Sequence, residues 1–208
     1  MIRVVVATFN PGKAREIAEL LSGLSIEIVS LADYPSIPEP EEHGSSFAEN
    51  AAIKARHACE RTGEVALADD SGLEVDALGG RPGINSSRFA GPNAADAQRN
   101  ALLLDMLSDT PDEQRTARFR CVAALATPAG EIQIFEGACE GYIVREPRGE
   151  NGFGYDPIFY LPEFGKTMAE LPPDVKNRIS HRGQAISAAT AALEKMVGNS
   201  SRLGTSSF

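Results

Sequence analysis

The pattern of hydrophobic and polar positions opens with a strand, a tight loop and a helix. Arg3 to Ala7 is a short apolar run rich in valine, which is typical of a buried strand. Asn10-Pro11-Gly12 follows and favours a turn. Apolar residues then recur at the spacing of one helical face, at Ala14, Ile17, Ala18 and Leu21. The first 21 residues therefore predict a strand-loop-helix unit.

Two further apolar runs predict strands at 26–30 and 65–68. The segment 34–40 contains several prolines, which fit neither a helix interior nor a central strand, so it should be an exposed connecting loop. After this loop, Ser46 and Glu49 have the spacing of a capping box, and an alanine-rich run continues to about Arg61. We expect a helix there.

The second half of the chain predicts a long hairpin. Residues 116–127 alternate, which places Ala117, Phe119, Cys121, Ala123 and Leu125 on one side. The turn-forming Pro128-Ala129-Gly130 leads into an apolar run at 132–135. These two segments should pair as neighbouring antiparallel strands.

Helices and loops complete the pattern. A helix should open at Asn93 and a last one should run from about Arg182 to Val197, while 146–157 is rich in Gly, Pro and charge and should be a loop. The tail 198–208 is expected to be frayed. Without internal repeats or a long linker, we expect an α/β fold in one domain spanning 1–208, with helices flanking a mixed central sheet.

Composition limits the possible partners. The 208 residues are 42% hydrophobic and 24% charged, enough to bury one sizeable core. The net charge of −9 disfavours a nucleic-acid polymer, because such binding needs clustered cations. A small polyanion is still compatible with an acidic chain if a few cations are local and a divalent metal bridges carboxylates to phosphate.

The cysteines and the N-terminus indicate a cytoplasmic protein. Cys59, Cys121 and Cys139 are far apart and lack the close pairing of zinc sites or disulfide scaffolds, which suggests a reducing compartment. The opening apolar run is too short for a signal sequence or a membrane span. We therefore expect no membrane association.

The first loop with candidate chemistry is Thr8-Phe9-Asn10-Pro11-Gly12-Lys13, between the first strand and its helix. Unpaired N–H groups and the helix dipole favour an anion there, and Lys13 adds a full positive charge. Triphosphate would suit this loop. The alternative is a plain turn with a surface lysine, because the segment is neither a Walker loop nor a dinucleotide fingerprint.

The second candidate is the carboxylate pair Asp69 and Asp70, expected at the end of the strand 65–68. Neighbouring side chains on a strand point to opposite faces, so one of the two should be chemical and the other structural. Magnesium takes one or two carboxylates plus phosphate and water, and Glu41 and Glu42 are a second source of carboxylate. The alternatives are a turn with capped amides and a solvated acidic loop.

The third candidate joins the segments 152–157 and 180–184. Phe153 and Tyr155, set among glycines, could stack on a flat base. Asp156 and Arg182 could then meet the N1–H and O6 of a 6-oxopurine, whereas adenine would leave both protein groups unpaired at about 1–3 kcal/mol each. Alternatively, the aromatic rings belong to the core and His181 only caps a helix.

Taken together, these segments resemble the inosine triphosphate pyrophosphatase family. The resemblance rests on five ordered stretches between residues 7 and 185, namely ATFNPGK, SFAENAAIKARHA, ADDSGLEVDALGGRPGINSSRFAG, GFGYDPIF and ISHRGQA. It implies a mixed, twisted sheet with two lobes around a substrate cleft and a homodimer. It also implies Mg²⁺-dependent cleavage of ITP, dITP and XTP into the monophosphate and pyrophosphate.

The resemblance also assigns roles to individual residues. Asp70 would be the general base or a metal ligand, with Glu41 as the other metal carboxylate. Substrate contacts would come from the phosphate loop, from Lys54 and Ser71, and from a base site, which together comprise Thr8, Phe9, Asn10, Pro11, Gly12, Lys13, Lys54, Ser71, Phe153, Gly154, Tyr155, Asp156, Lys176, His181 and Arg182.

The chain departs from the family pattern at Phe9, where many relatives have glycine. A phenylalanine side chain there hinders the close approach of the backbone to phosphate, so the sequence does not fix the course of the loop backbone. Two other functions fit the same residues. One is a house-cleaning pyrophosphatase for other modified nucleotides, and the other is a sensor that binds triphosphate without cutting it.

Overall fold

The computed structural model describes the backbone of residues 2–203 and the side chains up to residue 198. Its strands form a seven-stranded sheet in the order β2-β1-β3-β4-β5-β6-β7. The strands are β1 Ile2–Val6, β2 Ile26–Ser30, β3 Val65–Val75, β4 Thr116–Ala126, β5 Ile132–Ile143, β6 Phe159–Leu161 and β7 Lys166–Thr167. β1 pairs in parallel with β2 and β3, whereas β6 is antiparallel to β5 and β7. The predicted mixed α/β fold is thereby confirmed.

The chain divides into two compact units. Unit 1 comprises Met1–Asp70, Val122–Glu136 and Arg182–Phe208, and unit 2 comprises Ser71–Cys121 and Gly137–His181. The four boundaries between the units fall inside β3, β4, β5 and the first turn of the helix that begins at His181, so the chain passes from one unit to the other four times. Each unit is described below by itself.

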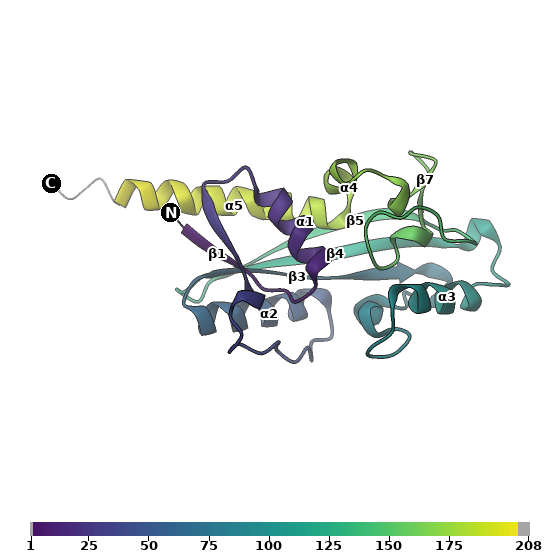
Figure 1. The fold of residues 1–208 in the computed structure, drawn as a ribbon, viewed down its shortest axis with the longest axis horizontal. Helices are drawn as coiled ribbons and strands as arrows, with labels where there is room; N and C mark the ends of the chain where they lie inside the picture. Colours follow the sequence, from purple (N-terminus) through teal and green to yellow (C-terminus); the bar gives the residue numbers. More distant parts are fainter. Residues whose placement is uncertain (1, 204–208) are drawn as a thin grey trace. The chain divides into compact units, whose positions relative to one another are not determined.

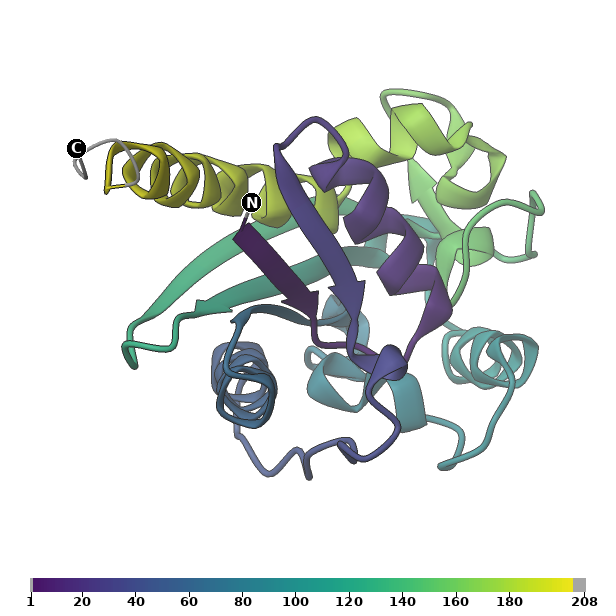
Figure 2. The same ribbon diagram turned by 60° about the vertical axis from the view of Figure 1, so that its left-hand side comes forward.

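The α-helices are α1 Pro11–Leu21, α2 Phe47–Thr62, α3 Asp96–Met106, α4 Pro173–Ile179 and α5 His181–Leu203. In unit 1, α2 covers one face of the strands while α1 and α5 cover the other (Figures 1 and 2). Within residues 2–203, no helix combines the length and the apolar character needed to cross a membrane.

Each unit has its own apolar core. In unit 1, the strand residues Val4, Val5 and Leu67 are buried together with Ile17 and Leu21 of α1. The core of unit 2 is one cluster that includes Leu73, Val75, Leu103, Phe119, Tyr155, Ile158, Phe159 and Met168. Burial of these side chains is what fixes the strands and loops that carry the polar site residues.

The structure confirms most predicted elements and corrects several boundaries. α2 begins after Ser46, whose Oγ accepts a hydrogen bond from the Glu49 N–H. However, β3 does not end at residue 68 but runs to Val75, because Leu73 and Val75 are fully buried and continue the strand period. Asp69 and Asp70 therefore lie inside a strand.

Three further boundaries differ from the sequence prediction. α3 begins at Asp96 rather than Asn93, and β5 extends to Ile143 instead of stopping at 135. The short helix α4, which begins with a proline, was not predicted. α5 continues to Leu203, so the prediction of a frayed tail from residue 198 is wrong up to that point, and 204–208 lie outside the described residues.

Candidate active site

The loop between β1 and α1 is ordered by its own side chains. Asn10 is the N-cap of α1, and its Oδ1 accepts from the Lys13 N–H at 3.1 Å. The Thr8 Oγ1 accepts from the Asn10 N–H at 3.1 Å, and Pro11 occupies the first helical turn, where its missing N–H costs nothing. Phe9 is 40% exposed. The predicted strand-loop-helix unit is therefore present, with Asn10 and Thr8 shaping the loop.

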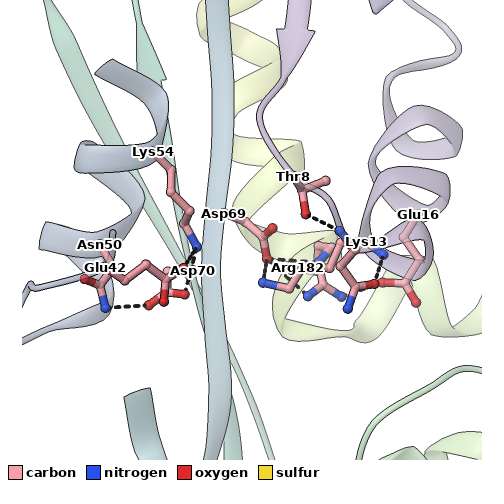
Figure 3. A network of polar contacts seen from close by, with 10 residues as sticks. Thr8, Lys13, Glu16, Glu42, Asn50, Lys54, Asp69, Asp70 and Arg182 are labelled. Atoms are coloured by element: carbon pink, nitrogen blue, oxygen red, sulfur yellow. Dashed lines mark hydrogen bonds and ion pairs between the residues drawn. The ribbon is translucent and has the colours of Figure 1, made fainter. Parts of the chain in front are cut away.

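Asp69 forms ion pairs with two basic side chains on one side of β3, those of Lys13 and Arg182. The Lys13 Nζ lies 3.1 Å from Asp69 Oδ2, and Arg182 donates to the same oxygen through Nε at 3.2 Å and Nη2 at 3.1 Å. Arg182 also donates to Glu16 of α1 at 2.5 Å. Figure 3 shows Asp69 turned toward α1 and α5, with Lys13 and Arg182 around it. Asp69 thus connects the Thr8–Lys13 loop with the start of α5.

The charge of Asp69 is strongly stabilised. Complete burial by itself would raise the pKa of this carboxyl, but Lys13 and Arg182 together hold the pKa well below its usual range. Asp69 is therefore ionised at any ordinary pH and is a poor proton acceptor. These properties fit the structural member of the carboxylate pair.

Asp70 points to the opposite side of β3, toward α2 (Figure 3). Its Oδ1 accepts from the Lys54 Nζ at 3.0 Å, and its Oδ2 accepts from the Asn50 Nδ2 at 3.3 Å. Lys54 also donates to Glu42 Oε1 at 3.0 Å. The sequence prediction that the two aspartates face opposite sides is confirmed, and each has its own lysine.

Burial acts on Asp70 in the direction that suits a base. It raises the pKa of Asp70, and the nearby Lys54 and Lys13 only partly oppose this. For Lys54, burial would lower the pKa, but the carboxylates of Asp70, Asp69 and Glu42 raise it above the usual value. Lys54 therefore stays charged beside a carboxyl whose proton affinity is increased.

The acidic loop before α2 brings Glu42, rather than Glu41, to this group. Glu42 contacts Lys54, while Glu41 is exposed and its backbone carbonyl meets the His43 Nδ1 at 3.1 Å. Asn50 of α2 stabilises this loop, because its Oδ1 accepts a hydrogen bond from the Gly44 N–H at 2.9 Å. Asn50 thus connects the acidic loop with Asp70.

Sequence reasoning left Asn50 off the candidate site, although a signal was available. Asn50 and Lys54 are four residues apart in α2 and so share one face of that helix. Because Lys54 is a candidate, a polar residue one helical turn earlier on the same face is the sequence signal for a second contact to Asp70.

In unit 2, Phe153, Asp156 and Lys176 come together around the loop 152–156. Asp156 Oδ2 accepts from the Phe153 N–H at 2.9 Å and forms a buried ion pair with Lys176. The Lys176 Nζ lies 4.8 Å from the centre of the Phe153 ring. Gly152 has φ +76°, and a Cβ there would lie 2.0 Å from Asp156 Oδ2. Only glycine allows this close approach.

The other predicted base residues have different surroundings. Tyr155 is 4% exposed, belongs to the core of unit 2, and donates from its hydroxyl to the Ser86 carbonyl at 2.9 Å, so the alternative core interpretation holds for it. His181 is buried and stacks on Phe119 with ring centres 4.6 Å apart. Ser71, next to Asp70 in β3, is partly exposed.

Arg182 belongs to unit 1, whereas Asp156 belongs to unit 2. Its guanidinium donates to Asp69 and Glu16, and within the described contacts the cation paired with Asp156 is Lys176. Lys176 is therefore the donor that the structure places beside the acceptor Asp156.

Each unit presents its own set of chemical groups. Unit 1 offers the lysines Lys13 and Lys54 and an oxygen-rich pair, Asp70 and Glu42, which suit phosphate and a hard cation. Unit 2 offers an aromatic ring with a buried donor and acceptor, which suits a planar heterocycle.

Comparison with known proteins agrees with this chemistry. The model of the Ham1 family matches residues 4–192. The chain belongs to the Ham1 family. This Ham1 chain is 53% identical over 195 residues to a protein of Desulforamulus reducens named dITP/XTP pyrophosphatase, covering 94% of the chain and 97% of that relative. A Geobacillus kaustophilus protein of the same name is 52% identical, covering 97% and 99%.

Solved structures show the same fold. A HAM1 protein from Coxiella burnetii matches with a TM-score of 0.85 and 49% identity, over 94% of this Ham1 chain and 100% of that structure. The family resemblance drawn from the five sequence stretches is thus confirmed.

Proposed function

We propose that this chain hydrolyses non-canonical purine nucleoside triphosphates, namely ITP, dITP and XTP, to the monophosphate and pyrophosphate. The observation that carries the proposal is the arrangement of Asp70, buried beside Lys54 and Asn50 with Glu42 on the same lysine. It occurs in a chain about half identical, over almost its full length, to relatives named dITP/XTP pyrophosphatase.

The phosphates are assigned to residues of unit 1. The N-terminus of α1 and the Lys13 ammonium offer positive charge at the Thr8–Lys13 loop, and Lys54 offers a second ammonium beside Asp70. Both lysines would stabilise negative charge that develops on the departing pyrophosphate. Lys13 is oriented for this by Asp69.

Asp70 is the candidate general base. Without a bound metal, burial raises the pKa of Asp70 and makes it a stronger proton acceptor than an exposed carboxylate. It can then take a proton from an attacking water, and the alternative role of the same carboxylate is that of a metal ligand. Lys54 and Asn50 orient the carboxyl from α2. No covalent intermediate is required.

The donor set of Asp70 and Glu42 fits Mg²⁺. Both ligands are carboxylate oxygens of residues that meet at one lysine, and magnesium usually takes one or two carboxylates and keeps water and phosphate as its other ligands. Among the side chains that the structure describes, no group of three or more His, Cys, Asp or Glu could hold a metal ion, so phosphate and water would have to supply the other ligands. When bound, Mg²⁺ would neutralise phosphate charge.

The base is assigned to the loop 152–156 of unit 2. Phe153 is partly exposed and can stack on a purine, while Asp156 and Lys176 form an acceptor and donor pair. A 6-oxopurine offers N1–H to Asp156 and O6 to Lys176. Adenine offers the opposite pattern, which would set an acceptor against Asp156 and a donor against Lys176, so neither contact to the base could form.

The location, the oligomeric state and the kind of substrate complete the proposal. We propose that the enzyme works in the cytoplasm as a homodimer, acting on free nucleotides rather than on a nucleic-acid polymer or at a membrane. The net charge of −9 supports a substrate other than a nucleic-acid polymer, and three buried cysteines outside disulfides support a reducing compartment. The homodimer follows from the family resemblance.

The test is pyrophosphate release from ITP, XTP, GTP and ATP at equal concentration, with Mg²⁺ and with a chelator. The expected result is metal-dependent release from ITP and XTP that far exceeds release from GTP and ATP. Equal release from all four would keep the phosphate assignment and refute the base assignment. Binding of ITP without release would indicate a nucleotide sensor, and preference for a modified pyrimidine would indicate another house-cleaning pyrophosphatase.

A further inference from the structure

Helix α3 holds the loop 152–156 by both backbone groups of Gly154. The Gly154 N–H donates to Asp96 Oδ2 at 2.6 Å, and the Gly154 carbonyl accepts from the Asn100 Nδ2 at 3.1 Å. Asp96 and Asn100 are four residues apart, so both side chains lie on one face of α3. A single helix thus fixes the N–H and the C=O of the same glycine.

At Gly154 the two hydrogen bonds from α3 fix the backbone conformation. Its φ is +65°, a left-handed conformation, and nothing lies within 4 Å of where a Cβ would be. Glycine has no side chain to fix its torsion angles, so external hydrogen bonds must select one conformation. Because Gly154 stands between Phe153 and Asp156, its torsion angles determine how the ring and the carboxylate are placed.

The same helix is braced against a second segment. Arg99 pairs with Asp96 and donates to the Ser87 carbonyl at 3.0 Å. The Tyr155 hydroxyl donates to the neighbouring Ser86 carbonyl at 2.9 Å. The turn 83–88 therefore supports both the helix and the loop, and the three segments form one hydrogen-bonded assembly in unit 2.

Asn100 buries an amide oxygen without a hydrogen bond, which lowers stability and which core packing does not require. It is 4% exposed, and in the part of the chain that the structure describes its Oδ1 has no hydrogen-bond partner. The orientation of the amide is fixed, since only its NH₂ can donate to the Gly154 carbonyl. A buried unpaired oxygen lowers stability, so an apolar residue would serve the core better than Asn100.

We propose that Asp96 and Asn100 are positioning residues for base recognition, acting through Gly154 on Phe153 and Asp156. They do not touch the substrate, and the inference rests on the proposed function of the loop 152–156. Their loss leaves the phosphate residues of unit 1 intact and loosens only the base loop. Base-dependent binding should therefore suffer before phosphate binding or cleavage.

The experiment compares Asp96→Ala and Asn100→Leu with wild type. KM and kcat are measured with ITP and with ATP, and the inhibition constant of inorganic triphosphate reports phosphate binding without a base. We expect KM for ITP to rise about tenfold and the preference for ITP over ATP to fall, while kcat for ITP and the inhibition constant change less than about twofold.

Two further variants control for charge and for folding. Asp96→Asn keeps an acceptor oxygen for the Gly154 N–H and should recover most of the ITP affinity. Asp105→Ala removes an exposed carboxylate from the same helix and should behave as wild type. Because the Asp96 side chain is 44% exposed, its replacement should leave the fold intact, which circular dichroism and Tm would check.

The possible results separate the positioning role of Asp96 and Asn100 from the assignment of the base to the loop 152–156. Unchanged KM and preference in both variants would overturn the positioning role, as would equal changes in KM and in the inhibition constant, which indicate general loosening. A wild-type protein without preference for ITP would overturn the base assignment and this inference together. Wild-type preference with unchanged variants would overturn this inference alone.

Discussion

Asp69 and Asp70 are neighbours in β3, yet their surroundings push their pKa values in opposite directions. Asp69 is surrounded by Lys13 and Arg182, which lower its pKa, whereas burial raises the pKa of Asp70. A carboxyl with a lowered pKa holds cations, and one with a raised pKa accepts a proton more readily. This difference supports the proposal that Asp69 anchors the surrounding cations and that Asp70 takes part in the chemistry.

The first prediction concerns Asp70. Asp70→Asn keeps the shape of the side chain but removes the proton acceptor and one candidate metal ligand. The rate of pyrophosphate release from ITP should fall about 100-fold or more. Circular dichroism and Tm should show that the fold persists, and a variant with near wild-type kcat would remove Asp70 from the chemistry.

The second prediction separates two adjacent glutamates. Glu42→Gln should raise the Mg²⁺ concentration needed for half-maximal activity by about tenfold, because Glu42 meets Lys54 beside Asp70. Glu41→Gln is the matched control, since it makes the same change at the exposed neighbour and should leave that concentration unchanged. A reversed result would restore Glu41 as the second metal carboxylate.

At the residue scale, periodicity predicted part of this arrangement. That Asp69 and Asp70 face opposite sides follows from the strand period, and the structure confirms it. Which side carries which lysine depends on the packing of α1 and α2, which no local pattern encodes. The choice of Glu41 over Glu42 was made within an irregular loop, where no period fixes the direction of a side chain.

At the scale of elements, the loop 152–156 of unit 2 needs glycine at residue 152, where the backbone lies close to the Asp156 carboxylate. Gly152→Ala should strain a backbone at φ +76° and drive a methyl group into the Asp156 carboxylate. We expect about tenfold higher KM for ITP and a lower Tm. Steady-state kinetics and thermal unfolding would measure the two effects.

Gly165→Ala is the matched control for this substitution. It also has a positive φ, +62°, but no atom lies within 4 Å of its Cβ position. It should lower Tm through backbone strain while leaving KM unchanged. Equal KM values for both variants would show that the contact between Gly152 and Asp156 has no part in substrate binding.

The elements themselves were predicted best where the pattern was strong. β1, β2, α2 and the hairpin of β4 and β5 follow from apolar periodicity and from the Ser46 cap. The extension of β3 through a polar stretch and the short helix α4 were missed. In β3, burial of Leu73 and Val75 overrides the turn-like composition of Asp-Asp-Ser-Gly.

At the scale of the whole molecule, Asp69 should couple stability to pH. Its folded pKa lies below the unfolded value of about 3.9, so its contribution is fully present above that value and is lost as pH falls through the folded pKa. Asp69→Asn should lower the free energy of unfolding at pH 7 by about 3 kcal/mol, because it leaves Lys13 and Arg182 without their counter-charge.

Denaturant unfolding at pH 7 and at pH 3 would measure this coupling. The difference between wild type and Asp69→Asn should be smaller at pH 3, while the exposed control Asp105→Asn should match wild type at both. A difference that does not shrink on acidification would mean that the Asp69 charge is not what stabilises the fold.

The sequence was sufficient for the fold class and the family because both rest on ordered patterns spread over most of the chain. It was insufficient for contacts between residues far apart in sequence. The pairing of Arg182 with Asp69 and Glu16, 113 and 166 positions away, depends on where α5 packs. Such contacts arise from tertiary packing and carry no local signal.

The most direct measurement of the central claim is a competition assay with ITP, GTP and ATP in one mixture with Mg²⁺, with every product identified and quantified by ion chromatography. The ratio of initial rates gives the ratio of kcat/KM values directly. We expect IMP to appear first, matched one to one by pyrophosphate, while GTP and ATP are largely spared. Formation of IDP with inorganic phosphate, or of IMP, GMP and AMP at equal rates, would contradict the central claim.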